Sequence, residues 1–196
     1  MTATTTNAFD LQRIQKIRKW ALGLALLVAV ALAFVSASPW IKQPFSEGVE
    51  SFGLGAIIIS IVGRAWCSLY IGGRKKAEVV AMGPYSISRN PLYVFSYFGA
   101  FGVGAQTGSV TMGLLFVLIA VAVFHFTIQR EEAWLTAEFG PTYTAYTART
   151  PRCGPDLSKW RDEAELTVKP QFFLVTLRDG LVFLLAVPIF ESIDWA

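Results

Sequence analysis

The stretch from Pro91 to Gln129 contains no Asp, Glu, Lys or Arg. About 20 apolar residues suffice to cross the roughly 30 Å of hydrocarbon in a bilayer, so this stretch is too long for one transmembrane helix. Thr107, Gly108 and Ser109 interrupt it with residues that favour a turn. The sequence therefore predicts two shorter helices packed as a hairpin in a membrane.

Two further apolar runs precede this hairpin. Trp20 to Ser38 carries no charge and follows a basic tail, which predicts a transmembrane helix. The run from roughly Val49 to Gly72 has Glu50 at its start and is apolar beyond it apart from Arg64, which either serves a function with a nearby partner or snorkels to the surface. Hydrophobic residues make up 54% of the chain and charged residues 16%, which is typical of a bilayer protein.

Lysine and arginine indicate how the chain is oriented. The N-terminal tail and the loop around residues 74–89 are basic, whereas segment 39–50 has Lys42 alone and segment 106–110 has none. Cytoplasmic loops of membrane proteins carry an excess of Lys and Arg. We therefore expect the N-terminus and the segment after residue 129, with any active site there, to lie in the cytoplasm. The net charge of +3 reflects these loops, and no nucleic-acid partner is expected.

The chain after the hairpin returns to charged sequence. Arg130 to Phe139 is predicted to form a separate amphipathic helix against the bundle, and Gly140 with Pro141 ends it and starts another short turn. Phe172 to Phe190 contains Arg178 and Asp179. It is either a fifth span with an internal ion pair or an interfacial turn followed by a segment too short to cross.

The predicted fold is an all-α membrane protein with four to five transmembrane helices, a cytoplasmic amphipathic helix and a C-terminal segment that covers a cofactor. It forms one domain over 1–196. Its parts are a cytoplasmic tail at 1–19, a four-helix membrane core at 20–129, a cytoplasmic catalytic segment at 130–169 and a membrane-associated or spanning helix at 170–196.

Chemistry is expected first in the polar, turn-rich loop from Gly83 to Tyr93, which leads directly into the hairpin. Pro91 fits the first turn of a helix because its missing N–H would have no partner there, and nearby free N–H groups can bind a ligand's oxygen atoms. Arg89 stands beside that helix start. The second place is the adjacent pair Glu131 and Glu132, two anions that need a cation nearby.

The order of these elements resembles a known family. The chain reads Gly83-Pro84-Tyr85, then Arg89-Asn90-Pro91-x-Tyr93, a hydrophobic hairpin, Glu-Glu-x2-Leu-x3-Phe-Gly-x2-Tyr-x2-Tyr from Glu131, and Pro-Arg ending at Arg152. It looks like the membrane methyltransferases that include isoprenylcysteine carboxyl methyltransferase and the phospholipid N-methyltransferases. The likeness covers roughly Arg64 to Arg152.

The resemblance implies S-adenosylmethionine as the cofactor. Carboxylates and aromatic faces can hold its sulfonium and ammonium, while Arg89 can meet its carboxylate. It implies a catalytic part for Arg89, Glu132 and Arg152. It also implies that Phe95, Tyr143 and Tyr146 contact the acceptor. The implied cofactor-binding residues are Gly83, Pro84, Tyr85, Arg89, Asn90, Pro91, Tyr93, Glu131 and Glu132.

Two positions depart from the family's pattern. Asn90 stands where the family often has His, and an amide cannot titrate, so a general base at this position is excluded. Phe95 stands where the family favours Gly. Its ring either narrows the acceptor tunnel or shifts helix packing, which weakens the case for prenylcysteine itself as acceptor.

The predicted reaction is methyl transfer to a small lipophilic acceptor at the cytoplasmic membrane face. The acceptor is an isoprenylcysteine-like carboxylate or thiol, or a phospholipid amine. Alignment and desolvation are the protein's main contributions to such a displacement, and no metal is required. A carboxylate or thiolate needs no base, whereas an amine must first lose a proton.

Two other classes of protein stay open. Sterol-reducing membrane enzymes that use NADPH show a similar Arg-x-x-His-x-x-Tyr loop, but they are generally longer. A non-catalytic membrane binding module would keep the fold, although the intact Arg89, Glu131 and Glu132 argue against it.

Three remaining side chains receive simpler interpretations. Cys67 and Cys153 match no metal-site spacing and are predicted to be free thiols. His125 makes either a hydrogen bond in helix packing or a catalytic contact.

Overall fold

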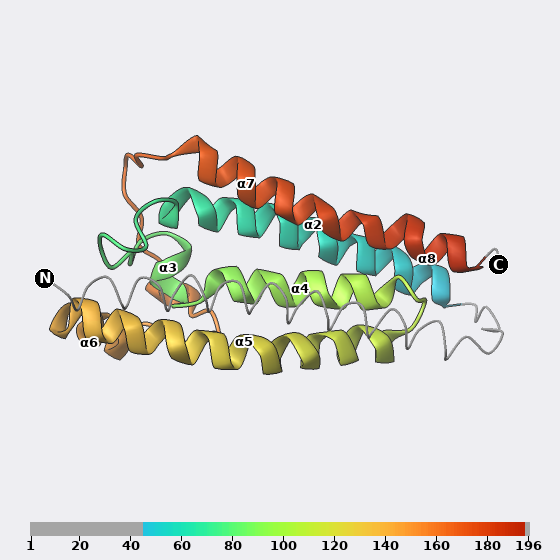
Figure 1. Ribbon diagram of the computed structural model, residues 1–196, viewed down its shortest axis with the longest axis horizontal. Coiled ribbons are helices and arrows are strands. Elements are labelled where there is room, and N and C mark those ends of the chain that lie inside the picture. The colour runs from blue at the N-terminus through green and yellow to red at the C-terminus, as the bar shows by residue number, and fades with distance from the viewer. Residues whose placement is uncertain (1–44, 195–196) are drawn as a thin grey trace, which may run out of the picture.

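The computed structural model describes residues 45–194, and within them the regular structure is helical throughout. This confirms the predicted all-α class. The predicted helix at Trp20–Ser38 and the N-terminal tail lie outside the described residues. Figure 1 shows the long helices lying side by side. α2 (Ser46–Ile71) packs on α4 (Pro91–Ala105), α4 packs on α5 (Val110–Phe139), and a C-terminal helical run covers the other side of α2.

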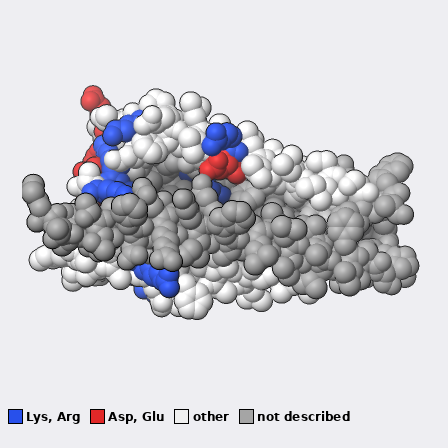
Figure 2. Space-filling model, viewed as in Figure 1, with Lys and Arg blue, Asp and Glu red and all other residues white. Residues whose placement is uncertain are grey.

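Three of the described helices are long and apolar enough to cross a membrane: Ser46–Ile71, Val110–Phe139 and Pro170–Phe190. α4 is apolar but has only 15 residues. On the face in Figure 2, the charged side chains of the described residues gather toward one end and leave the surface at the other end uncharged. These features make the chain an integral membrane protein whose charged end projects from the apolar bundle.

The turn of the predicted hairpin lies where the sequence placed it. α4 ends at Ala105, and Gly108 adopts a positive φ of 69° that few other residues tolerate. Ser109 then caps α5, because its side chain accepts a hydrogen bond from the backbone N–H of Met112. The break at 107–109 is thereby confirmed.

The prediction of a separate amphipathic helix at Arg130–Phe139 is wrong. α5 continues without interruption from Val110 to Phe139, so the second helix of the hairpin is long and carries the glutamates beyond the apolar part. Arg, Glu, Ala and Leu are good helix formers, and nothing between 129 and 139 removes a helical hydrogen bond. The helix ends at Gly140, as predicted, with a φ of 50°, and α6 (Pro141–Arg149), a helix of nine residues, follows where the sequence predicted a short turn.

The C-terminal run has no break at Asp179. α7 (Pro170–Leu181), η2 (Val182–Leu185) and α8 (Ala186–Asp194) are continuous, which favours a fifth span over an interfacial turn. Arg178 and Asp179 form an exposed ion pair at 3.5 Å. The guanidinium of Arg64 lies 5.4 Å from the ring centroid of Phe183, so Arg64 has a cation–π partner in this neighbouring run.

The remaining short elements gather at the charged end. These are α3 (Pro84–Ile87), α6 and η1 (Leu157–Lys159), and Figure 1 shows α3 and α6 beside the end of α5 that carries Glu131 and Glu132. The bundle thus brings the predicted loop and the predicted glutamate pair to the same end of the molecule.

Candidate active site

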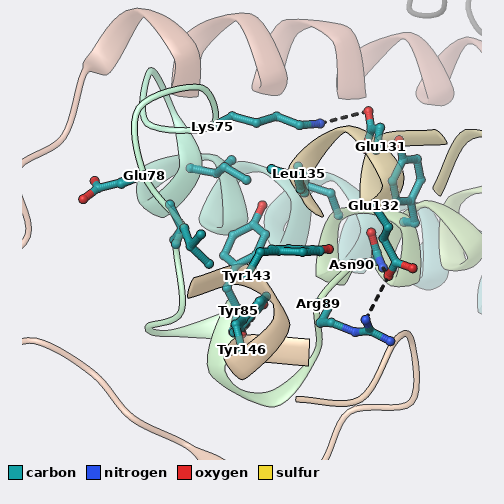
Figure 3. A pocket seen from close by; sticks show the side chains of 15 residues that line it. Lys75, Glu78, Tyr85, Arg89, Asn90, Glu131, Glu132, Leu135, Tyr143 and Tyr146 are labelled. Atoms are coloured by element: carbon teal, nitrogen blue, oxygen red, sulfur yellow. Dashed lines mark hydrogen bonds and ion pairs between the residues drawn. The ribbon is translucent and has the colours of Figure 1, made fainter. Parts of the chain in front are cut away.

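A pocket lies between α3, the end of α5 and α6. Figure 3 shows side chains from the loop before α4, from α5 and from α6 converging on it. The predicted site residues that line it are Tyr85, Arg89, Asn90, Tyr93, Glu131, Glu132, Tyr143 and Tyr146.

Glu132 joins three other predicted residues. Its Oε1 lies 3.4 Å from Nη1 of Arg89 and accepts a hydrogen bond from the Asn90 amide at 3.4 Å. Its Oε2 accepts from Nε of Arg152 at 2.9 Å. This hydrogen bond raises the pKa of Arg152. Glu132 is only 9% exposed, so its carboxylate acts as a buried anchor that orients Arg89, Asn90 and Arg152.

Glu131 has a different cation. Its Oε1 lies 2.9 Å from Nζ of Lys75, which reaches across from the loop between α2 and α3. From the sequence we interpreted the basic cluster at 74–76 only as a marker of orientation. We also expected a cation near the two glutamates, without identifying it. Lys75 is therefore a pocket residue that the sequence reasoning missed.

The loop before α4 owes its shape to Gly83 and to a later segment. Gly83 has a φ of 55°, and a Cβ there would lie 2.3 Å from the Tyr70 ring. The Gly83 N–H donates to the carbonyl of Arg161 at 2.7 Å, and the Arg89 N–H donates to the carbonyl of Pro151 at 2.8 Å. The segment after α6 thus runs beside the loop and fixes it.

Several predicted residues support the pocket without lining it. Gly83 and Pro84 shape α3, and Pro91 opens α4 as its first residue. Arg152 acts through Glu132. Asn90 does not cap α4 with its side chain, which donates instead to Glu132 and to the carbonyl of Arg152 at 3.0 Å.

Phe95 lies away from the pocket. It packs between α4 and α2, where a Cβ on Gly63 would lie 2.2 Å from its ring, and its ring faces Trp66 at 6.3 Å between centroids. The sequence predicted that Phe95 either narrows the acceptor tunnel or shifts helix packing. Its contacts show an effect on helix packing.

The phenols of the site are buried. Tyr146 Oη donates to the carbonyl of Tyr85 at 2.8 Å and so ties α6 to α3. Burial, followed by the negative charge of Glu132, raises the pKa of Tyr143 to about 12. Burial also raises the pKa of Tyr85 and of Tyr146. These side chains are neutral at physiological pH and do not serve as bases.

The raised pKa of Tyr143 predicts a loss of stability in alkali. An unfolded tyrosine ionises near pH 10, about its ordinary pKa, whereas the folded one stays neutral up to about pH 12. The stabilisation is therefore complete below pH 10 and is lost as the pH rises toward 12. The unfolding midpoint of the detergent-solubilised protein should fall over this range, and less steeply in Tyr143→Phe. Equal slopes for the two proteins would contradict the assignment.

Two buried donor atoms in the site have no hydrogen-bond partner among the described residues. They are Nε of Arg89 and Oη of Tyr85, and both side chains line the pocket. Buried polar groups are nearly always paired in proteins, so such atoms indicate a place for a polar ligand.

The sequence reasoning also missed the apolar wall. It is formed by side chains from the end of α2, the following loop, α4 and α5: Ile71, Val79, Val80, Leu92 and Leu135. Glu78 completes the rim and pairs with Arg74 at 3.3 Å. The wall adds a lipophilic side to a pocket whose other side is ionic.

Three residues weighed in the sequence lie elsewhere. His125 is exposed on α5, where its Nε2 is 3.0 Å from the Gln129 amide, so its contact is a hydrogen bond along the helix. Cys67 and Cys153 are free, as predicted. No group of three or more His, Cys, Asp or Glu residues within 45–194 is arranged to hold a metal ion.

Comparison with known proteins bears on the family of this chain. A family model of phospholipid methyltransferases matches residues 54–142. The protein-S-isoprenylcysteine O-methyltransferase of Schizosaccharomyces pombe is 31% identical over 90 residues, which cover 45% of this chain and 38% of that protein. The family match includes both the loop from Gly83 and the glutamate pair.

Two bacterial proteins match over more of the chain. The nickel-cobalt-cadmium resistance protein NccN of Alcaligenes xylosoxydans xylosoxydans is 34% identical, with 85% of this chain and 78% of that protein covered. The cobalt-zinc-cadmium resistance protein CzcN of Cupriavidus metallidurans is 33% identical, with 91% and 82% covered. No solved structure gives a significant match. The family model, the yeast relative and the motif residues gathered in one pocket place this chain in the superfamily of integral membrane methyltransferases that includes the isoprenylcysteine and phospholipid methyltransferases.

Proposed function

We propose that this chain transfers the methyl group of S-adenosylmethionine to a small lipophilic acceptor at the cytoplasmic membrane face. The observation that carries the proposal is the composition of one pocket. It combines two buried carboxylates, an arginine whose buried Nε has no hydrogen-bond partner among the described residues, four buried phenols and an apolar wall.

The residues present fit this cofactor. Nε of Arg89 and the Tyr85 hydroxyl are hydrogen-bond donors without a partner in the described part of the chain, and they suit the carboxylate or the ribose of the cofactor. Glu131, Glu132 and the faces of Tyr85, Tyr93 and Tyr143 suit its cationic groups. When bound, S-adenosylmethionine supplies an electrophilic methyl group on a sulfonium.

The chain's own contribution is alignment and exclusion of water. Glu132 orients Arg89 and Asn90, and the buried position of both glutamates strengthens their attraction for a cation. Tyr143 and Tyr146 stay neutral, so they donate hydrogen bonds without taking a proton from the acceptor. Arg152 donates a hydrogen bond to Glu132 and so helps to hold its carboxylate in place.

The acceptor is proposed to approach from the apolar wall. Ile71, Val79, Val80 and Leu135 offer a surface for a lipid or prenyl chain, while the ionic side holds the cofactor. Because Asn90 and the neutral phenols provide no base, an acceptor that is already a carboxylate or thiolate fits directly. An amine must be deprotonated before it reaches the site.

The chain is proposed to act as one membrane domain. Its charged end, with the site, faces the cytoplasm, as the distribution of Lys and Arg predicts. The names of NccN and CzcN refer to metal resistance, but the described residues give no metal-binding group on which to extend that function to this chain.

The test is calorimetric titration of the purified protein with S-adenosylhomocysteine and, separately, with NADPH. We expect saturable binding of S-adenosylhomocysteine and none of NADPH. Binding of NADPH alone would move the protein to the reductases. Binding of neither would favour a non-catalytic membrane module.

A further inference from the structure

Lys75 spans the opening between two walls of the pocket. It lies in the loop between α2 and α3, and Figure 3 shows its side chain extended above Leu135 toward the carboxylate of Glu131. The two charged atoms are 2.9 Å apart. The Glu131 side chain is 6% exposed and that of Lys75 is 34% exposed, so the pair lies at the rim with its anion inside.

The same loop supplies part of the apolar wall. Val79 and Val80 line the pocket four and five residues after Lys75, and Ile71 lies four residues before it. The ion pair therefore connects the segment that carries these side chains to α5. Burying a carboxylate such as that of Glu131 costs free energy unless a cation lies nearby. The contact with Lys75 offsets part of this cost.

The neighbouring lysine is placed differently. Lys76 is exposed and does not line the pocket, although it carries the same charge on the same loop. Lys75 therefore differs from Lys76 in its position at the pocket and not in its charge. Lys76 also provides a matched control for any substitution of Lys75.

We propose that Lys75 is a positioning residue of this site: it holds the Glu131 carboxylate and the wall at residues 71–80 in the geometry that binds the cofactor. The proposal rests on the proposed function for the identity of that ligand. Lys75 acts through Glu131 and the loop, since its ammonium is engaged by the carboxylate at the rim.

The first experiment measures the affinity of purified full-length variants for S-adenosylhomocysteine. Lys75→Met should weaken binding by about tenfold or more, as removal of one partner of a buried charge pair does, whereas Lys76→Met should bind like the parent. Lys75→Arg, which keeps the charge, should recover most of the loss. Unchanged affinity in Lys75→Met, or no recovery in Lys75→Arg, overturns the proposal.

A double-mutant cycle tests whether Lys75 works through Glu131. The variant Lys75→Met with Glu131→Gln should lose no more affinity than the weaker-binding single variant, because each substitution removes the same interaction. Losses that add in full would show that the two residues act independently, and would also overturn the proposal.

A second readout needs no ligand, which separates this proposal from the proposed function. Val79→Cys places a thiol on the wall, and the rate at which a thiol reagent labels it is measured in proteins with and without the lysine substitutions. The rate for protein that has only Cys67 and Cys153 is subtracted from each. Adding Lys75→Met should accelerate labelling, and adding Lys76→Met should not. If the parent protein binds no S-adenosylhomocysteine, the proposed function fails, and these rates alone decide: acceleration supports the role of Lys75 in fixing the wall, and equal rates overturn it.

Discussion

Replacing Glu132 by glutamine is expected to weaken S-adenosylhomocysteine binding by roughly 30-fold or more, the loss typical when a buried, hydrogen-bonded charge pair loses one partner. The Glu132 carboxylate pairs with Arg89 and accepts hydrogen bonds from Arg152 and the Asn90 amide. Glutamine keeps one acceptor oxygen and presents an N–H₂ group to a guanidinium, so at least one of these contacts turns repulsive. Calorimetric titration of the purified variant measures the loss.

Glu138→Gln is the matched control for this substitution. Glu138 lies on the same helix but is exposed, so the same chemical change there should leave affinity at the parental value. The helical content of both variants by circular dichroism should be unchanged, because glutamine and glutamate are similar helix formers. Parental affinity in Glu132→Gln would remove this carboxylate from the binding site.

Gly83→Ala is expected to destabilise the protein and to abolish ligand binding together. The φ of 55° is unfavourable for alanine, and the added Cβ would lie 2.3 Å from the Tyr70 ring. The Tyr70 ring packs against Tyr85 of α3, and its hydroxyl donates a hydrogen bond to Asp162. The ring therefore has little room to move. We expect α3 to shift and to carry Tyr85 away from the pocket. Thermal unfolding in detergent and the same titration measure the two effects.

Gly140→Ala separates the two causes. Gly140 has nearly the same backbone angles, with φ 50° and ψ −123° against 55° and −132° for Gly83, but nothing lies within 4 Å of an added Cβ. It should show only the backbone cost, whereas Gly83→Ala should lose about a further 1–3 kcal/mol from overpacking. Equal destabilisation of the two variants would show that the contact with Tyr70 is unimportant.

The fold was predictable where a local signal sets it. The uncharged stretch from Pro91 and the turn residues at 107–109 locate the hairpin, because burial of charge in lipid and the conformational freedom of glycine act locally. The continuity of α5 across residue 129 was missed because a change from apolar to charged sequence marks the edge of the membrane and not the end of a helix. Gly140, which does end α5, was visible in the sequence.

The candidate site was predictable only in part, for a similar reason. The motif residues Arg89, Asn90 and Glu132 meet in one hydrogen-bonded group, as their resemblance to the family implied. Lys75 and Val79 carry no such signal, because their place depends on how the loop after α2 folds back over α5. The sequence predicts a cation near the carboxylates of Glu131 and Glu132. Only the tertiary structure shows which of several basic residues pairs with Glu131.

The most direct measurement is transfer of labelled methyl from S-adenosylmethionine into lipid. Purified protein in vesicles of bacterial lipid extract, supplied with carrier acceptors bearing a carboxylate, a thiol or an amine, would be incubated with the labelled cofactor and partitioned into organic solvent. The account predicts label in the organic phase with the parent protein and a strong reduction with Glu132→Gln. Organic-phase label no greater than that of protein-free vesicles, for every acceptor, would contradict it.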